Sequence, residues 1–164
     1  MDQIDRIVKQ WRRERPDVDP EPMALIGRLQ RVVQALRPAL DATHGEFGLS
    51  GDLFDVLAAL RRSGKPYQLT PTDLYREMML SSGAMTNRID RLEREGLVQR
   101  KADPGDRRGT LVSLTSKGQA LIDRALLGHV ANERRLLGTL DAKERAQLAT
   151  LLRKLLAGIE RDSR

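Results

Sequence analysis

Apolar residues recur at intervals of three and four along most of this chain, which is the spacing of a helix that buries one face. The spacing predicts helices over residues 2–15, 23–43, 49–62, 70–79, 82–95, 115–135 and 141–159. Two runs, residues 97–101 and 110–114, are typical of short strands and flank a turn-rich segment, so they predict a β-hairpin. The expected fold class is therefore mainly α with one small β-hairpin.

Residues that begin and end helices support these boundaries. Residues 16–22 hold three prolines, which cannot continue the first helix, and Pro38 predicts a kink or a split in the second. Gly96 stands where the helix at 82–95 should end. The polar side chains placed to cap helix N-termini are Ser50, Thr70, Thr115 and Asp141.

Residues 70–114 follow the order helix, turn, helix, strand, strand, which is that of a winged helix-turn-helix. At 100° per residue, Met85, Ile89 and Leu92 fall on an inward face of the second helix. The candidate DNA contacts at the start and on the opposite face of that helix are Ser81, Ser82, Thr86, Asn87, Arg91 and Arg94. Such a helix start suits phosphates, and such side chains suit base edges in the major groove. A solvated amphipathic helix is the alternative interpretation.

The hairpin supplies a second basic element. Arg107 and Arg108 are expected at the tip of a loop, residues 103–109, whose shape comes from Pro104 and Gly105. A projecting arginine suits a minor groove, where the potential is most negative. A charged, soluble turn is the alternative, but the two elements in this order favour binding to double-stranded DNA.

The helices outside this lobe predict association. Residues 141–159 carry more apolar side chains than a lone terminal helix can hide, so we expect them to pack against another chain. The chain divides into an N-terminal helix extension and dimerisation helix at 1–48, a winged helix-turn-helix DNA-binding lobe at 49–114, and C-terminal dimerisation helices at 115–164. The expected assembly is a homodimer on a pseudo-palindromic operator, with half-sites about one helical turn apart.

Composition narrows the function classes. A formal net charge of +6 favours an anionic partner, without choosing between nucleic acid and a membrane surface. Cysteine is absent and the two histidines lie far apart in sequence, so we expect neither a metal nor another cofactor. The chain has no apolar run of about 18 residues and no signal-peptide core, which predicts a cytoplasmic protein with no membrane partner. It also has no phosphate loop, nucleophile elbow or histidine-pair motif, which argues against an enzyme.

The predicted helix at 49–62 has a second unusual face. Asp55 and Arg62 are seven residues apart, which places them on one stripe about 10 Å long. Ala58 and Ala59 lie between them and add little bulk. Opposite charges that flank a floor of small residues suit a planar polar molecule, whereas a solvent-exposed face is the alternative.

Arg88 stands apart from the outward face of its helix. By angle it lies at the edge of the apolar side, and a partly buried guanidinium needs a carboxylate or carbonyl partner. The carboxylates that compete for it are Asp55, Asp90 and Glu93. Pairing with Asp55 would join the helix before the DNA-binding motif to the recognition helix.

The segment LTPTDLYREMMLSSGAMTNRIDRLEREGLVQRKADPGDRRGTLVSLTSKG resembles the MarR family of transcriptional regulators over its whole DNA-binding lobe. The most specific pieces are TNRIDRLEREGLVQR, DPGDRR and LTSKG. The resemblance implies that residues 82–95 enter the major groove and that the arginine-bearing wing enters the minor groove. It also implies that the N- and C-terminal helices build a two-fold dimer.

The pieces QWRRERP, FDVLAALRRSG and SSGAMTNRID are similar to the urate-responsive branch of that family. The resemblance assigns ligand binding to Trp11, Asp55 and Arg62, and coupling to Arg88 and Arg100. It implies a repressor released by urate or a related small aromatic anion, which would repel Asp55 and loosen it from Arg88. For Trp11, a structural contact of the first helix is the alternative. For the whole chain, the alternatives are a ligand-independent winged-helix DNA-binding protein and a winged-helix protein-interaction module.

Overall fold

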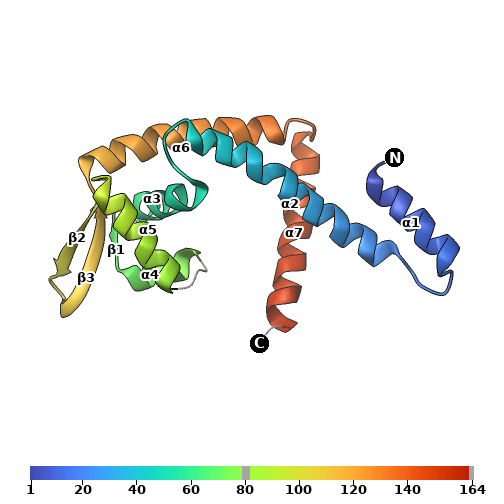
Figure 1. The fold of residues 1–164 in the computed structure, drawn as a ribbon, viewed down its shortest axis with the longest axis horizontal. Helices are drawn as coiled ribbons and strands as arrows, with labels where there is room; N and C mark the ends of the chain where they lie inside the picture. Colours follow the sequence, from blue (N-terminus) through green and yellow to red (C-terminus); the bar gives the residue numbers. More distant parts are fainter. Residues whose placement is uncertain (79–81, 163–164) are drawn as a thin grey trace.

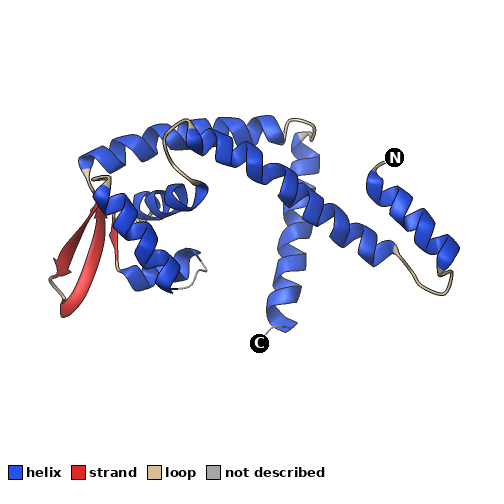
Figure 2. Ribbon diagram, in the orientation of Figure 1, coloured by secondary structure: helices blue, strands red, loops and turns tan. Residues whose placement is uncertain are grey.

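The chain is built from helices and one small sheet, in a computed structural model that describes residues 1–78 and 82–162. Its elements are α1 (Gln3–Glu14), α2 (Glu21–Gly45), α3 (Gly51–Arg62), β1 (Gln68–Leu69), α4 (Pro71–Met78), α5 (Ser82–Arg94), β2 (Val98–Asp103), β3 (Asp106–Leu114), α6 (Ser116–Leu136) and α7 (Ala142–Asp162). Figure 1 shows this order, and Figure 2 shows the sheet at one end of a helical molecule. The expected fold class, mainly α with a small β element, is confirmed.

Within the described residues the sheet holds three antiparallel strands in the order β1-β3-β2, one strand more than the sequence predicts. In the extra strand, Gln68 lies opposite Ser113 and Leu69 lies opposite Val112. The preceding Tyr67 carbonyl accepts a hydrogen bond of 3.1 Å from the Leu114 amide. A strand of two residues has no alternation to detect, so only the edge of β3 reveals it.

The hairpin turn is tighter than the sequence predicts. Asp103 pairs with Asp106, so residues 104–105 alone lie between the strands, and the Asp103 carboxylate accepts from the Gly105 amide at 2.8 Å. The expected seven-residue loop is therefore wrong, because proline and glycine here serve a short turn and the strand ladder continues beyond it. Arg107 and Arg108 belong to β3, and their side chains lie outside the described part of the structure.

Local capping explains where several helices begin. The Thr70 hydroxyl accepts from the Asp73 amide at 3.0 Å, and the Thr115 hydroxyl accepts from the Gly118 amide at 3.0 Å. Asp141 and Glu144 form a reciprocal capping box before α7. These three predicted caps are confirmed, whereas Ser50 occupies the N-cap position of α3 without a side-chain capping bond.

Pro38 does not split α2, which runs unbroken to Gly45. A proline removes one backbone donor and crowds one carbonyl, but tertiary packing can hold the remaining turns. Here the Asn132 side chain of α6 donates to the Ala39 carbonyl at 3.0 Å and fastens α2 beside the proline. The predicted split is therefore wrong, and the kink that Pro38 also predicts stays a prediction.

The hydrophobic core lies where α3, α4, α5 and α6 meet the sheet. Its largest fully buried side chains include Leu53, Leu57, Leu60, Leu74, Met85, Ile89, Leu92, Val112 and Ile122. Burying one such side chain contributes about 1.5–3 kcal/mol. The core therefore holds one face of α5 against the rest of the lobe and leaves the other face to solvent.

A second region has little core of its own. We call it the helical arm and define it as α1, residues 21–33 of α2, and α7, which extend away from the lobe in Figure 1. No described residue of α7 is buried. The exposed large apolar side chains of the arm include Met23, Leu25, Ile26, Val32, Val33, Leu148, Leu151, Leu152, Leu155, Leu156 and Ile159. Among the helices described, none is long and apolar enough to cross a membrane.

Candidate nucleic-acid interface and ligand cavity

Helix α5 presents a polar face to solvent, as its sequence predicts. Met85, Ile89 and Leu92 are almost fully buried, and the exposed residues on the other side are Thr86, Asn87, Arg91 and Arg94. Of the two serines expected at its start, Ser81 lies outside the described residues. Ser82 begins the helix, and its side chain is likewise not described.

The two exposed arginines of α5, Arg91 and Arg94, bind partners one turn away along the chain. Arg91 donates to the Glu95 carboxylate at 3.2 Å, and Arg94 donates to the Asp90 carbonyl at 3.4 Å. Exposed pairs of this kind stabilise a helix by only about 0.3–0.5 kcal/mol. Both arginines can therefore exchange these partners for a phosphate or a base.

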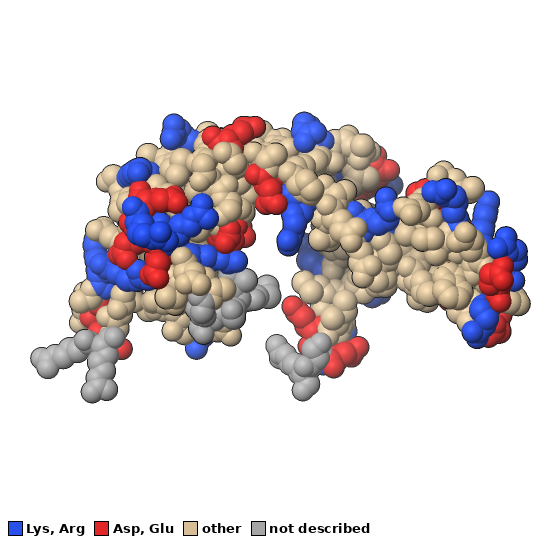
Figure 3. Space-filling model, viewed as in Figure 1, with Lys and Arg blue, Asp and Glu red and all other residues tan. Residues whose placement is uncertain are grey.

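Arg100 ties the wing to the recognition helix. Its guanidinium pairs with Asp90 and Glu93 of α5, and its backbone amide donates to the Glu93 carboxylate at 2.9 Å. Strand β2 and helix α5 are therefore joined by charge as well as by the core. Figure 3 shows basic and acidic side chains interleaved over this lobe.

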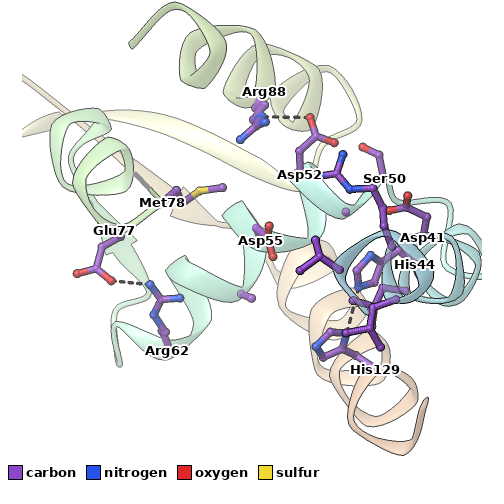
Figure 4. Close-up of a pocket in the computed structure, with 16 residues that line it drawn as sticks. Asp41, His44, Ser50, Asp52, Asp55, Arg62, Glu77, Met78, Arg88 and His129 are labelled. Carbon is purple, nitrogen blue, oxygen red and sulfur yellow. Dashed lines mark hydrogen bonds and ion pairs between the residues drawn. The ribbon is translucent and has the colours of Figure 1, made fainter. Parts of the chain in front are cut away.

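A cavity of about 980 Å³ lies between α2 and α3, and α4, α5 and α6 each contribute to its wall. Its wall comprises Val33, Leu36, Arg37, Leu40, Asp41 and His44 from α2, Ser50, Gly51, Asp52, Asp55, Ala58 and Arg62 from the start and body of α3, Glu77 and Met78 from α4, Arg88 from α5, and His129 from α6 (Figure 4). Helices α2 and α3 each contribute residues at three- and four-residue spacing, so one face of α2 opposes one face of α3. This volume is that of a small-molecule site.

The structure brings together two of the three predicted ligand residues. Asp55 and Arg62 both face the cavity, with Ala58 between them as a small floor, while Ala59 is buried in the core instead. Trp11 is not among the residues that line this cavity: it lies on α1, which Figure 1 shows well away from α3, and 41% of its surface is exposed. The described chain alone therefore does not bring Trp11 to Asp55 and Arg62.

The paired arginines of the cavity have partners that differ from the sequence-based expectation. The Arg88 Nε donates to Asp52 Oδ2 at 3.0 Å, and Arg62 pairs with Glu77 of α4 at 2.5 Å. The pairing of Arg88 with Asp55 is therefore wrong, because Asp52 lies on the first turn of α3, which faces α5. The other two candidates are both engaged by Arg100.

Asp55 occupies an unusual electrostatic position. This residue lines the cavity and is exposed overall, and partial burial raises the pKa of its carboxylate by desolvation, against the opposing influence of His44 and Arg88. It forms no hydrogen bond or ion pair with any residue that the structure describes. An oxygen in this setting gains a partner when a ligand brings an N–H group to it.

The two histidines of the chain meet in the cavity wall, which the sequence does not reveal. His44 Nε2 and His129 Nδ1 are 3.1 Å apart; the His44 ring stacks on Phe54, and the His129 ring lies tilted against the same phenyl ring. His129 Nε2 lies 3.2 Å from the Glu133 carboxylate, and the tautomers of the two rings decide which nitrogen donates between them. Burial, and then the neighbouring His129, lower the pKa of His44.

Comparison with known proteins gives the family. A family model described as the MarR family matches residues 47–109. The HTH-type transcriptional regulator PecS of Dickeya dadantii is 43% identical over 150 residues, which cover 92% of this chain and 90% of that protein. The chain belongs to the MarR family. A mutant Escherichia coli MarR crystallised with operator DNA matches with a TM-score of 0.74 at 30% identity, covering 84% of this chain and 96% of that one.

This MarR-family chain is a DNA-binding transcriptional regulator and not an enzyme. The matched residues 47–109 include α3, α4, α5 and most of the hairpin, so they hold both helices of the winged helix-turn-helix. The similarity to PecS covers most of the arm as well as the lobe.

Sequence reasoning missed six titratable or charged residues of the cavity: Arg37, Asp41, His44, Asp52, Glu77 and His129. The helical pattern holds a partial signal, because Arg37 and Asp41 interrupt an otherwise apolar stripe that continues through Leu36 and Leu40. For Glu77 no such signal exists, because its contact with Arg62 depends on the angle at which α3 and α4 pack.

Proposed function

We propose that this MarR-family regulator is a homodimeric repressor that urate, or a related small aromatic anion, releases from its operator. The observation that carries the proposal is the cavity, whose wall includes Asp55 and Arg62 together with Arg88 of the recognition helix. A ligand bound in this cavity would therefore contact the helix that reads DNA. Such a position lets a ligand favour one orientation of α5 over another.

The helical arm supports the homodimer. Its apolar side chains are exposed on one chain, and contiguous surfaces of this kind mark protein interfaces. A second copy related by a two-fold axis would bury the same residues on both chains. The two α5 helices could then reach successive major grooves of a pseudo-palindromic operator.

DNA reading follows from the outward face of α5. Asn87 and Arg91 are of the types that make paired hydrogen bonds to adenine and guanine, and Thr86 and Arg94 stand beside them. Ser81 and Ser82 at the helix start suit phosphate contacts. We assign minor-groove contact to the wing arginines, Arg107 and Arg108.

The coupling route differs from the relay expected from the sequence. Asp52 holds Arg88, and Glu77 holds Arg62, so two ion pairs join α3 to the two helices of the DNA-binding motif. An anion in the cavity would attract both guanidiniums and weaken both pairs. Arg100 would pass a movement of α5 on to the wing, because it is bonded to Asp90 and Glu93.

In this proposal, dimerisation brings Trp11 to the ligand site. It is exposed on the arm, which we assign to the dimer interface. A ring at this position can cover a planar ligand by stacking. We infer that Trp11 lies beside a cavity only in the complete dimer.

A titration of the protein on its own upstream DNA, with and without urate, tests the proposal. Urate should weaken binding by about 5–150-fold, the usual range of allosteric coupling. The footprint should have dyad symmetry. Binding that is identical with and without urate or a phenolic acid would indicate a ligand-independent regulator, and a footprint without symmetry would argue against the dimer.

A salt titration separates the remaining alternative. Phosphate contacts release counterions, so the affinity for DNA should fall steeply as the salt concentration rises. A shallow dependence would favour a module that contacts another protein.

A further inference from the structure

Some charged side chains of the cavity wall take part in no ion pair with a described residue. The described residues of its wall include three arginines and four carboxylates: Arg37, Arg62, Arg88, Asp41, Asp52, Asp55 and Glu77. Arg62 is held by Glu77 and Arg88 is held by Asp52. Arg37 makes no hydrogen bond or ion pair with any described residue, although Asp41 lies one turn further along the same helix.

Arg37 also differs from the other two in its location. It projects from α2, a helix that precedes the winged helix-turn-helix, and it shares a face with Val33, Leu36 and Leu40. Arg62 and Arg88 instead connect α3 to α4 and α5. An anion that binds Arg37 therefore has no existing ion pair to break, whereas an anion that binds Arg62 or Arg88 must displace a carboxylate.

The opposite wall supplies a complementary group. Asp55 of α3 lacks a hydrogen-bond partner among the described residues and faces the same cavity (Figure 4). The side chains of Val33, Leu36 and Leu40 offer an apolar surface on the Arg37 side. Among the described residues, the cavity thus presents an unpaired cation at Arg37, an apolar wall, and two unpaired carboxylates, Asp41 on the Arg37 helix and Asp55 on the opposite wall.

We propose that Arg37 is the docking residue for the ligand's oxyanion, and that the ligand is a planar heterocycle whose ring N–H binds Asp55. This inference rests on the proposed function, which it deepens by naming the ligand chemistry and the anchoring residue. A guanidinium matches a planar oxyanion through two parallel hydrogen bonds, so it fixes the ligand's orientation as well as its charge. The ring N–H then offsets the repulsion between Asp55 and the anion.

The consequence is a division of work among three arginines. Arg37 binds the ligand from the α2 side. The bound anion then attracts Arg62 and Arg88 and weakens their ion pairs. An aromatic carboxylate without a ring N–H should enter less favourably, because it would meet Asp55 with no donor. The chain should therefore prefer urate to benzoate even though both are anions.

Calorimetric titration of the full-length protein without DNA tests this assignment, with urate and benzoate as probes. Arg37→Gln should weaken urate binding by at least about tenfold, as expected for a lost charge-assisted hydrogen bond. Arg37→Lys keeps the charge but not the paired geometry, so its affinity should lie between the two. Arg124→Gln is the matched control, because it removes an exposed arginine of α6 that is outside the cavity wall.

Asp55→Asn separates the two halves of the site. It should weaken urate binding, because the charged acceptor is lost, and it should leave benzoate binding unchanged or stronger. The thermal unfolding of Arg37→Gln should match that of the wild type, because the side chain is exposed and unpaired.

The outcomes are distinguishable. Urate binding by Arg37→Gln within twofold of the wild type would overturn the inference, as would a wild-type protein that binds neither probe. Urate binding that depends on Arg37 but does not release operator DNA would uphold the inference and refute the proposed function.

Discussion

In the DNA-binding lobe, Leu57 and Leu92 are fully buried within one chain, whereas Leu151 and Leu156 of the helical arm are 56% and 55% exposed. Both regions are equally regular in secondary structure, so the difference lies in what each helix packs against. The lobe has a core of its own and can hold α5 in place. We propose that a second chain completes the arm, which would then set how two lobes are spaced on DNA.

The largest effect should come from placing a charge on the arm. Leu152→Asp should prevent dimerisation and reduce operator affinity by at least about 100-fold, because a single lobe loses the gain from simultaneous binding. Light scattering and a gel-shift titration measure the two consequences. Gln147→Asp adds the same charge to α7 at a polar position and should behave like the wild type; a Leu152→Asp protein that remains dimeric would assign the interface elsewhere.

A core substitution in the lobe should lower the stability of the single chain and leave dimerisation unchanged. Ile89→Ala removes a side chain that is 1% exposed, and it should lower the free energy of unfolding by about 2–5 kcal/mol. Denaturant titration at several protein concentrations checks this. The loss should be the same at each concentration, whereas a loss that disappears in concentrated protein would mean that the lobe also depends on the partner.

The outward face of α5 should affect recognition and leave the fold intact. Arg91→Ala should reduce discrimination between operator and altered sites by about 1–3 kcal/mol, since a base contact is lost. Competition binding with single-base variants of the operator measures it. A uniform loss on all sequences would reassign Arg91 to the phosphate backbone.

The ion pair between the lobe helices should carry part of the response. Asp52→Asn frees Arg88, so it should shrink the coupling between urate and DNA by about 0.5–2 kcal/mol. Operator titrations with and without urate give the coupling. Asp123→Asn is the control, because it breaks the pair of 2.6 Å between Arg61 and α6, outside the path to α5. Equal effects of both changes would mean that the loss is only one of stability.

The smallest effect should be a pH dependence from Asp55. Its folded-state pKa is raised by burial, so the folded state keeps a proton that the unfolded state has released. Stability from this group is present at pH values below the unfolded pKa and is lost as pH rises through the raised folded value. Asp55→Asn should therefore stabilise the protein more at pH 7 than at pH 4, and only slightly, because solvent screens an exposed carboxylate. Melting temperatures at both pH values check the sign; a variant that is less stable only at pH 7 would contradict it.

Much of the lobe follows from local rules that a sequence displays. The inward face of α5, with Met85, Ile89 and Leu92, and the caps at Thr70 and Thr115 are set by helical periodicity and by backbone donors that need a partner. The resemblance to the MarR family extends these rules to a winged helix-turn-helix. These features depend on residues a few positions apart, so they can be recognised without knowing the packing.

The cavity depends on the tertiary structure instead. The choice of Asp52 over Asp55 for Arg88, and the meeting of His44 with His129, depend on the angle and depth at which separate helices pack. A sequence lists the charges that are available, but it does not state which pair lies within 3 Å. Arg37 is the clearest case, because a solvent-facing arginine and one that stands alone in a cavity look the same along the chain.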